Sequence, residues 1–191
     1  MRWLLLYAYS RQVPTSAAAV TLVGLAVWAL DQDSGKGPAQ VWIALLFLTA
    51  SVAAASIGLG GQDAALDRTA AIRWMPRRAA HLLLIGAVAG AALLAVQAAG
   101  PNLAPAALVV RDSAGLVGLA ALGAVLCGAP FAWALPTAWL GFTLLGPALP
   151  GIAGEVAGWM ILLPATTAST ATAWALFATG TLLYAVAGPR R

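Results

Sequence analysis

The sequence predicts an all-α polytopic membrane protein, from its composition, the length of its apolar runs and the placement of its charges. Hydrophobic residues make up 62% of the 191 residues and charged residues only 8%, whereas a soluble domain carries about 25% charged residues. The mean hydropathy is +0.90. So few charged side chains cannot cover the surface of a soluble protein of this length, so we expect the apolar runs to cross a membrane as helices.

Apolar runs of about 20 residues, the length needed to cross the hydrocarbon core, predict about six spans, with five or seven as alternatives. Polar breaks such as "DQDSGKGP" at 31–38 and "GPN" at 100–102 separate the runs. The expected spans are approximately 13–30, 39–59, 80–99, 114–134, 137–150 and 165–187. No soluble domain is expected, so residues 1–191 form a single transmembrane domain.

The first residues predict a helix that lies in the membrane interface. The apolar stretch from Trp3 to Tyr9 is short, and Arg11 interrupts it before the next apolar run. A cleaved signal peptide would have one uninterrupted apolar core followed by a small-residue cleavage site. We therefore expect residues 2–12 to form an interfacial helix with its aromatic rings at headgroup level.

Two stretches predict breaks between the later spans. The segment "LAPAALVVRDS", 103–113, bears adjacent charges and predicts a loop in which Asp112 or Ser113 caps the fourth span. Pro136 is expected to end that span, and the fifth to begin near Thr137.

The segment "GPALPGIAGEVAGWMILLP", 146–164, contains Pro147, Pro150 and several glycines, with Glu155 in its middle. A straight helix cannot continue through these residues. We expect a short fifth span followed by a re-entrant or interfacial helical segment at about 151–163. Non-helical backbone at membrane depth is tolerated where protein covers it or water reaches it.

The arginines predict that both termini are cytoplasmic. With the N-terminus inside, eight of the ten basic residues lie on the cytoplasmic side, and only Lys36 and Arg111 lie outside. The basic residues are nearly all arginine in a chain rich in alanine and glycine, which is typical of a GC-rich bacterial genome. We therefore expect a multi-pass protein of the bacterial plasma membrane.

The sequence contains no clear candidate residues for catalysis, metal binding or nucleotide binding. No catalytic triad, paired intramembrane carboxylate or phosphate-binding glycine loop is apparent, and the single histidine, His81, lies at the expected start of a span. Cys127 is the only cysteine and is expected to be a small buried apolar residue, so no cysteine metal site is predicted. The basic residues fall at span ends, which does not favour nucleic-acid binding. We predict no catalytic residue, no metal site, no nucleic-acid partner and no ionisable group clearly inside a span.

Small and hydroxylic residues within the spans suggest two further roles. Gly86 and Gly90 form a G-x-x-x-G pair that allows close helix contact, either within the bundle or with another subunit. The hydroxyls of Thr170, Thr172 and Thr179 either bond back to their own helix or line a weakly polar path for a substrate.

The segment "GGQDAALDRTAAIRWMPRRAAH", 60–81, is the one long charged stretch in the chain. Acids near its start and arginines after them predict a short helix that ends near Pro76. It either anchors the loop to acidic lipid or docks a cytoplasmic partner, and the sequence leaves both open. The residues expected to couple to a partner are Asp63, Asp67, Arg68, Arg73, Trp74, Arg77 and Arg78.

This order of elements resembles the membrane (permease) subunit of ABC-2-type (type V) ABC exporters. The resemblance is architectural and covers the whole chain. It rests on six spans, an N-terminal interfacial helix, a helical loop between spans two and three, and a broken segment before the last span. The stretch "ALDRTAAIRW" is also similar to small actinobacterial membrane proteins of exporter type. In that family the loop between spans two and three holds the coupling helix, which implies this role for 63–74 here.

The resemblance implies a permease without enzymatic activity or a cofactor of its own. ATP and Mg would bind a separate ABC ATPase subunit in trans, and a second permease subunit, identical or related, would complete the pathway. Apolar, uncharged spans then suggest an apolar or amphipathic substrate such as a drug, a lipid or a peptide. The alternative is a non-transporting anchor, assembly factor or immunity protein that docks a cytoplasmic partner through the same loop. An intramembrane enzyme is the third class.

Overall fold

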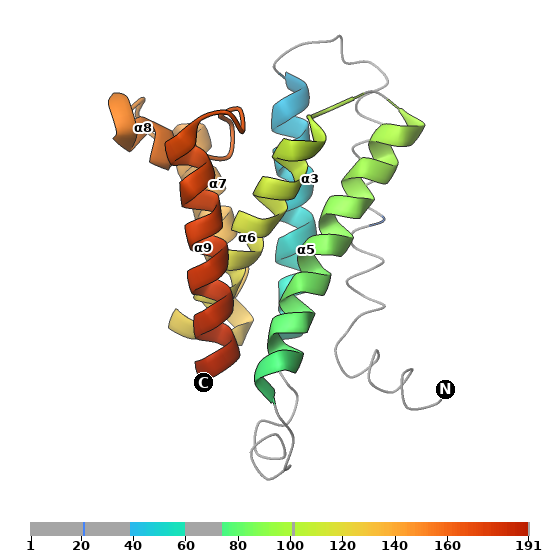
Figure 1. Cartoon of the computed structure of the whole chain (residues 1–191), viewed down its shortest axis with the longest axis vertical. Coiled ribbons are helices and arrows are strands. Elements are labelled where there is room, and N and C mark those ends of the chain that lie inside the picture. The colour runs from blue at the N-terminus through green and yellow to red at the C-terminus, as the bar shows by residue number, and fades with distance from the viewer. Residues whose placement is uncertain (1–20, 22–38, 60–73, 101, 191) are drawn as a thin grey trace.

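The computed structural model describes residues 21, 39–59, 74–100 and 102–190, and all regular secondary structure in these ranges is helical (Figure 1). The expected interfacial helix at 2–12 lies outside the described residues, as does all of the expected span 13–30 except Thr21. The coupling candidates Asp63, Asp67, Arg68 and Arg73 also lie outside them.

Four described helices are long and apolar enough to cross a membrane. They are α3 (Ala39–Ser56), which continues into the short 3-10 helix η1 (Ile57–Leu59), then α5 (Trp74–Ala99), α6 (Ala106–Leu126) and α9 (Thr167–Ala187). An all-helical fold with long apolar helices is therefore established, and this is the architecture of a membrane protein. Six spans and the orientation of the termini stay predictions.

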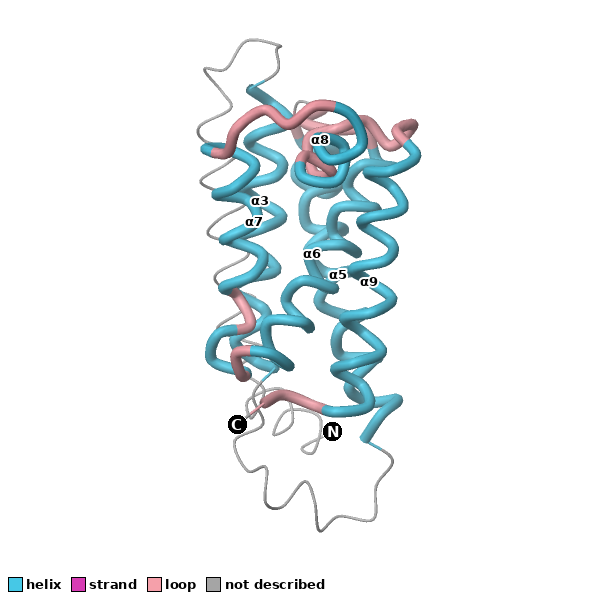
Figure 2. The backbone as a smooth tube through the Cα atoms, turned by 90° about the vertical axis from the view of Figure 1, so that its left-hand side faces the viewer, coloured by secondary structure: helices cyan, strands magenta, loops and turns pink. Residues whose placement is uncertain are grey.

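Helix α6 is the central helix of the bundle. It contacts α3, α5, α7 and α9, and it runs between its neighbours in both views (Figures 1 and 2). Protein covers 78% of its apolar window, whereas it covers only 22% of the corresponding window in α9. The outer helices therefore turn large apolar faces away from the bundle, as lipid-facing helices do, while α6 is shielded by protein.

Helices α6 and α9 run side by side in the same direction and touch through their backbones. A Cβ on Gly118 would overlap the backbone of Leu176, and a Cβ on Gly180 would overlap the backbone carbonyl of Gly118. Small residues at a helix contact let two backbones approach closely. The buried residues of α9 follow this seam at helical spacing, with Ser169, Ala173 and Gly180 on one stripe.

The expected end of a helix near Pro76 is wrong, because α5 begins at Trp74 and contains Pro76 in its first turn. The first four amide groups of a helix have no partner within that helix, so a proline there removes no hydrogen bond. Pro136 is a second case, since α7 (Ala134–Leu145) begins two residues before it. The helix begins three residues before Thr137.

The expected loop at 103–113 is also wrong. Helix α6 begins at Ala106 after Pro105, and Arg111 and Asp112 lie inside it rather than capping it. The expected fourth span, 114–134, therefore starts and ends too late. The helix ends at Leu126, and Gly128, whose φ of 99° favours glycine, leads into the short 3-10 helix η2 (Ala129–Phe131).

The stretch between α6 and α9 holds two short helices. Helix α7 has only 12 residues and ends before Pro147, and α8 (Gly151–Ala157) begins directly after Pro150. Figure 2 shows α8 seen end-on among the loops at one end of the bundle, rather than along it. The start of α9 and the end of α5 lie at this same end (Figure 1), which we call the α8 end.

Candidate functional site

An ion pair lies inside the bundle, on the central helix. Arg111 Nε donates a hydrogen bond of 2.8 Å to Asp112 Oδ1, and the two side chains are only 3% and 0% exposed. The sequence prediction that no ionisable group lies clearly inside a span is therefore wrong. The sequence also predicts Arg111 as a charge in an outer loop, and Arg111 is instead buried about one and a half turns below the start of α6.

The pair also connects α6 to α9. Arg111 Nη1 donates to Ser169 Oγ at 3.4 Å, and Ser169 Oγ donates to the carbonyl oxygen of Thr166 at 3.0 Å. Moving a charged side chain out of water costs roughly several kcal/mol per ion. Only close pairing and further hydrogen bonds offset this cost. A guanidinium bonded to both a carboxylate and a hydroxyl satisfies this requirement in part.

Some polar atoms of this buried cluster remain without a partner among the described residues. They are Arg111 Nη2, Asp112 Oδ2 and the indole Nε1 of Trp159. Trp159 is fully buried and its ring lies against Gly115, where a Cβ would overlap the ring. Gly115 follows Arg111 by one helical turn. Trp159, which follows α8, therefore packs against the central helix one turn from the ion pair.

The buried pair marks a functional-site candidate that sequence reasoning missed. Ionisable groups inside a membrane bundle are costly, and they are by default associated with function or with a structural switch. The signal was present in the sequence. Oppositely charged neighbours compensate each other, so "RDS" need not interrupt an apolar helix, and the small residues after it predict close packing.

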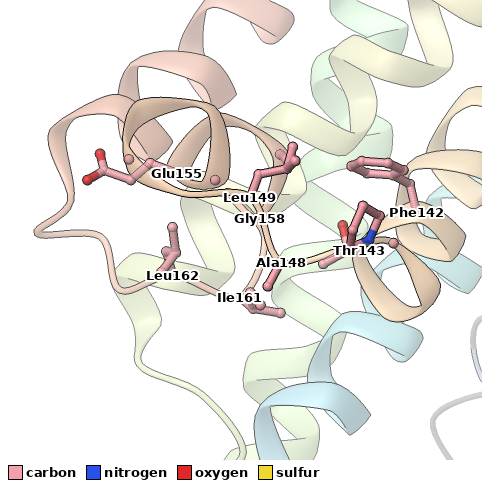
Figure 3. A pocket seen from close by; sticks show the side chains of 13 residues that line it. Phe142, Thr143, Ala148, Leu149, Glu155, Gly158, Ile161 and Leu162 are labelled. Atoms are coloured by element: carbon pink, nitrogen blue, oxygen red, sulfur yellow. The ribbon is translucent and has the colours of Figure 1, made fainter.

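A pocket opens between α7 and α8 (Figure 3). Its volume is about 520 Å³, and its walls come from the end of α7, the loop 146–149, α8 and the turn after α8. Trp139 Nε1 of α7 donates to the Ala157 carbonyl oxygen at 3.0 Å and so fixes the end of α8. Glu155 is the ionisable residue in the wall.

Basic residues gather at the opposite end of the bundle, which we call the basic end. The Arg77 guanidinium lies 5.9 Å from the centre of the Trp74 ring. The Arg78 guanidinium contacts Gly188, which has a φ of 73°. Arg190 donates from its backbone to Ala124 and from Nη1 to the Leu126 carbonyl oxygen at 3.2 Å. The carbonyl end of α6 thus receives a cation, as its dipole favours.

Three of the coupling candidates, Trp74, Arg77 and Arg78, form the first turns of α5 at this basic end. Asp63, Asp67, Arg68 and Arg73 lie outside the described ranges, so their grouping with these three residues stays a prediction. Cys127 was expected to be buried, and it is exposed at the end of α6. That prediction is wrong because α6 ends at Leu126, one residue before it.

The glycine pair of α5 faces the central helix. A Cβ on Gly86 would lie 3.2 Å from Val117 Cγ2, and one on Gly90 would lie 3.4 Å from Ser113 Oγ. Both glycines therefore mark a close approach within this chain.

The threonines of α9 do not share one face. At about 100° per residue, Thr172 and Thr179 lie on one side of α9 and Thr170 on the other. Each hydroxyl donates a hydrogen bond to a backbone carbonyl oxygen. Thr172 donates to Ala168, Thr179 to Ala175 and Thr170 to Pro164. The placement of the three threonines on opposite sides of α9 does not favour a substrate path lined by all of them. That path stays a prediction.

Comparison of the chain with known proteins identifies no relative. No protein-family model matches the chain, and no curated protein and no solved structure shows significant similarity to it. Function therefore has to be inferred from the chain's own residues.

Proposed function

We propose that this chain is the membrane-spanning subunit of an ATP-driven exporter of the ABC-2 type, in a bacterial plasma membrane. It would pair with a second permease subunit, and a separate ABC ATPase would hold ATP and Mg. In this proposal the chain has six spans and both termini are cytoplasmic.

The observation that carries the proposal is the order of elements before the last span. A short helix, α7, is followed by α8 at one end of the bundle and then by the long helix α9. This is the arrangement that the resemblance to ABC-2 permeases implies between spans five and six. Residues 60–73 stand between η1 and α5 in the sequence, as the coupling segment would stand between spans two and three.

Charge distribution supports the proposed orientation. Arg77, Arg78 and Arg190 lie at the basic end, and Glu155 lies at the α8 end. Positive charge is enriched on the cytoplasmic side of membrane proteins. The basic end would therefore face the cytoplasm, where the ATPase acts, and α8 would face outside.

Helix packing offers a route by which motion at the loop 60–73 would reach the bundle. A displacement of the loop acts first on the start of α5 at Trp74. Gly86 and Gly90 place α5 close against α6, and Gly118 places α6 close against α9. Nucleotide binding by the partner would thus shift the population between two arrangements of these helices. An apolar or amphipathic substrate fits the apolar faces of this bundle.

One observation fits the alternative equally well, a non-transporting membrane protein that docks a cytoplasmic partner. Helices α6 and α9 meet backbone to backbone, and the three Thr hydroxyls of α9 bond to backbone carbonyls. A core of this kind suits a static scaffold as well as it suits a pair of helices that move as one body.

Charge reversal in the loop tests the coupling role. In the exporter proposal, the double variant Arg68→Glu with Arg73→Glu keeps its membrane insertion and loses co-purification with the ATPase. Lys36→Glu reverses a charge in a loop expected on the other side and serves as the matched control, which should keep the ATPase. If the double variant instead fails to insert or inverts its topology, the arginines serve as a lipid anchor and the coupling role is rejected.

A further inference from the structure

The pocket between α7 and α8 has the dimensions and walls of a small-ligand site. Its volume of about 520 Å³ falls within the range of roughly 300–1,000 Å³ typical for ligand pockets, which are mostly apolar with a few polar groups. Four large apolar side chains line it, with one carboxylate at its rim (Figure 3). These are Phe142, Leu149, Ile161, Leu162 and the acid Glu155.

The carboxylate of Glu155 is partly buried and makes no hydrogen bond or ion pair with the described residues. The nearest opposite charges are already engaged or distant. Arg111 is paired with Asp112, while Arg77, Arg78 and Arg190 lie at the basic end. Among the described residues of the α8 end, Glu155 therefore contributes an uncompensated negative charge. A partly enclosed site with apolar walls strengthens its attraction for a cation.

The wall that carries Glu155 is held in place at two points. Trp139 Nε1 donates to the Ala157 carbonyl oxygen at 3.0 Å. Trp159 and Met160, directly after α8, are fully buried in the bundle. Both anchors lie within five residues of Glu155, so the backbone that carries this residue is held against the bundle. Binding to a pre-formed pocket costs less conformational entropy than binding to a flexible one, so the affinity is higher.

We propose that this pocket binds an organic cation attached to an apolar body. The cationic centre would pair with the Glu155 carboxylate, and the apolar body would lie against Leu149 and Ile161. The proposal concerns binding to the isolated chain and does not depend on the exporter function.

Equilibrium dialysis with radiolabelled tetraphenylphosphonium, on the purified chain in a neutral detergent, tests this directly. The expected result is saturable binding with one site per chain. Glu155→Gln keeps the side-chain volume and removes the charge, and it should weaken binding about fivefold, the size expected of a partly screened ion pair. Glu155→Asp should keep most of the affinity.

Two controls separate the charge from other effects. Ile152→Gln adds an amide to the same helix outside the pocket wall, and it should leave the dissociation constant unchanged. Phe142→Leu, which shortens the apolar wall, should weaken binding without removing the dependence on Glu155. Thermal unfolding in the same detergent establishes that each variant remains folded.

A phospholipid amine would supply the same chemistry from the bilayer. Competition by phosphatidylethanolamine that depends on Glu155 would assign the site to a lipid headgroup, and its absence would assign it to a soluble cation. The proposal is overturned if folded wild-type protein fails to bind the probe saturably, or if folded Glu155→Gln binds it as tightly as wild type does.

Discussion

Gly118 of α6 and Gly180 of α9 meet backbone to backbone, so closely that a Cβ on Gly180 would overlap the Gly118 carbonyl group. This contact joins the best-covered helix of the bundle to the last long helix. Arg111 lies seven residues before Gly118 on α6, and Ser169, which Arg111 contacts, lies eleven residues before Gly180 on α9. The close glycine contact and the buried ion pair are therefore parts of one α6–α9 interface.

Replacing Gly118 by alanine should destabilise the bundle. The added methyl group meets backbone atoms of Leu176, which cannot rotate away, and overpacking of this kind costs about 1–3 kcal/mol. Unfolding of the purified protein by a denaturing detergent measures the change. Gly141→Ala is the matched control, because a Cβ at Gly141 meets nothing within 4 Å. Equal stability of the two variants would show that α6 and α9 do not pack this closely.

Removing one member of the buried ion pair should be more harmful than removing both. Arg111→Met leaves Asp112 buried without its partner, at a cost of about 3–5 kcal/mol. In the double variant Arg111→Met with Asp112→Leu no charge is left unpaired, so its free energy of unfolding should lie above that of either single variant. A double-mutant cycle measures the coupling. Additive losses would mean that the two side chains do not form a pair.

Trp139→Phe should loosen α8 without unfolding the bundle. The variant removes the hydrogen bond from Nε1 to the Ala157 carbonyl oxygen, at a net cost of about 1 kcal/mol. Hydrogen exchange should accelerate at the amides that follow, such as Gly158, which bonds to the Gly154 carbonyl oxygen at 2.8 Å. Trp174→Phe, on an exposed position of α9, should leave this exchange unchanged. An unchanged rate in Trp139→Phe would argue against the anchor.

Cys127 reports the orientation of the chain. It is exposed at the end of α6, at the basic end, so the proposed topology places it in the cytoplasm. A membrane-impermeant maleimide should label it in inverted vesicles and leave it unlabelled in intact cells. Cys127→Ala combined with Ala148→Cys moves the thiol to an exposed residue at the α8 end, and the pattern should reverse. Labelling of Cys127 in intact cells would invert the topology.

The sequence predicts the fold class well and the ends of the helices poorly. Composition alone predicts a helical membrane protein, and the structure confirms an all-helical fold with long apolar helices. Prolines are the main source of error in the boundaries, because Pro76 and Pro136 predict helix ends and both lie in the first turns of helices. The sequence position of a proline does not show whether its missing amide would have had a partner.

The buried site was missed for a related reason. As independent charges, Arg111 and Asp112 would be excluded from a span, whereas as an ion pair they are buried together. The α6–α9 seam was also missed, since Gly86 and Gly90 match a known spacing while Gly118 and Gly180 lie on different helices. Which small residues meet across two helices depends on their relative level, and a single sequence does not contain that information.

The central claim is that this chain is the membrane subunit of an ATP-driven exporter, and one purification tests it most directly. The tagged chain is extracted from its native membrane in a mild detergent, and the bound proteins are identified by mass spectrometry and quantified. The proposal predicts an ABC ATPase in equal amount with the chain, lost on reversing Arg68 and Arg73. A folded, monodisperse chain that carries no ATPase would contradict the exporter proposal and favour a stand-alone membrane protein.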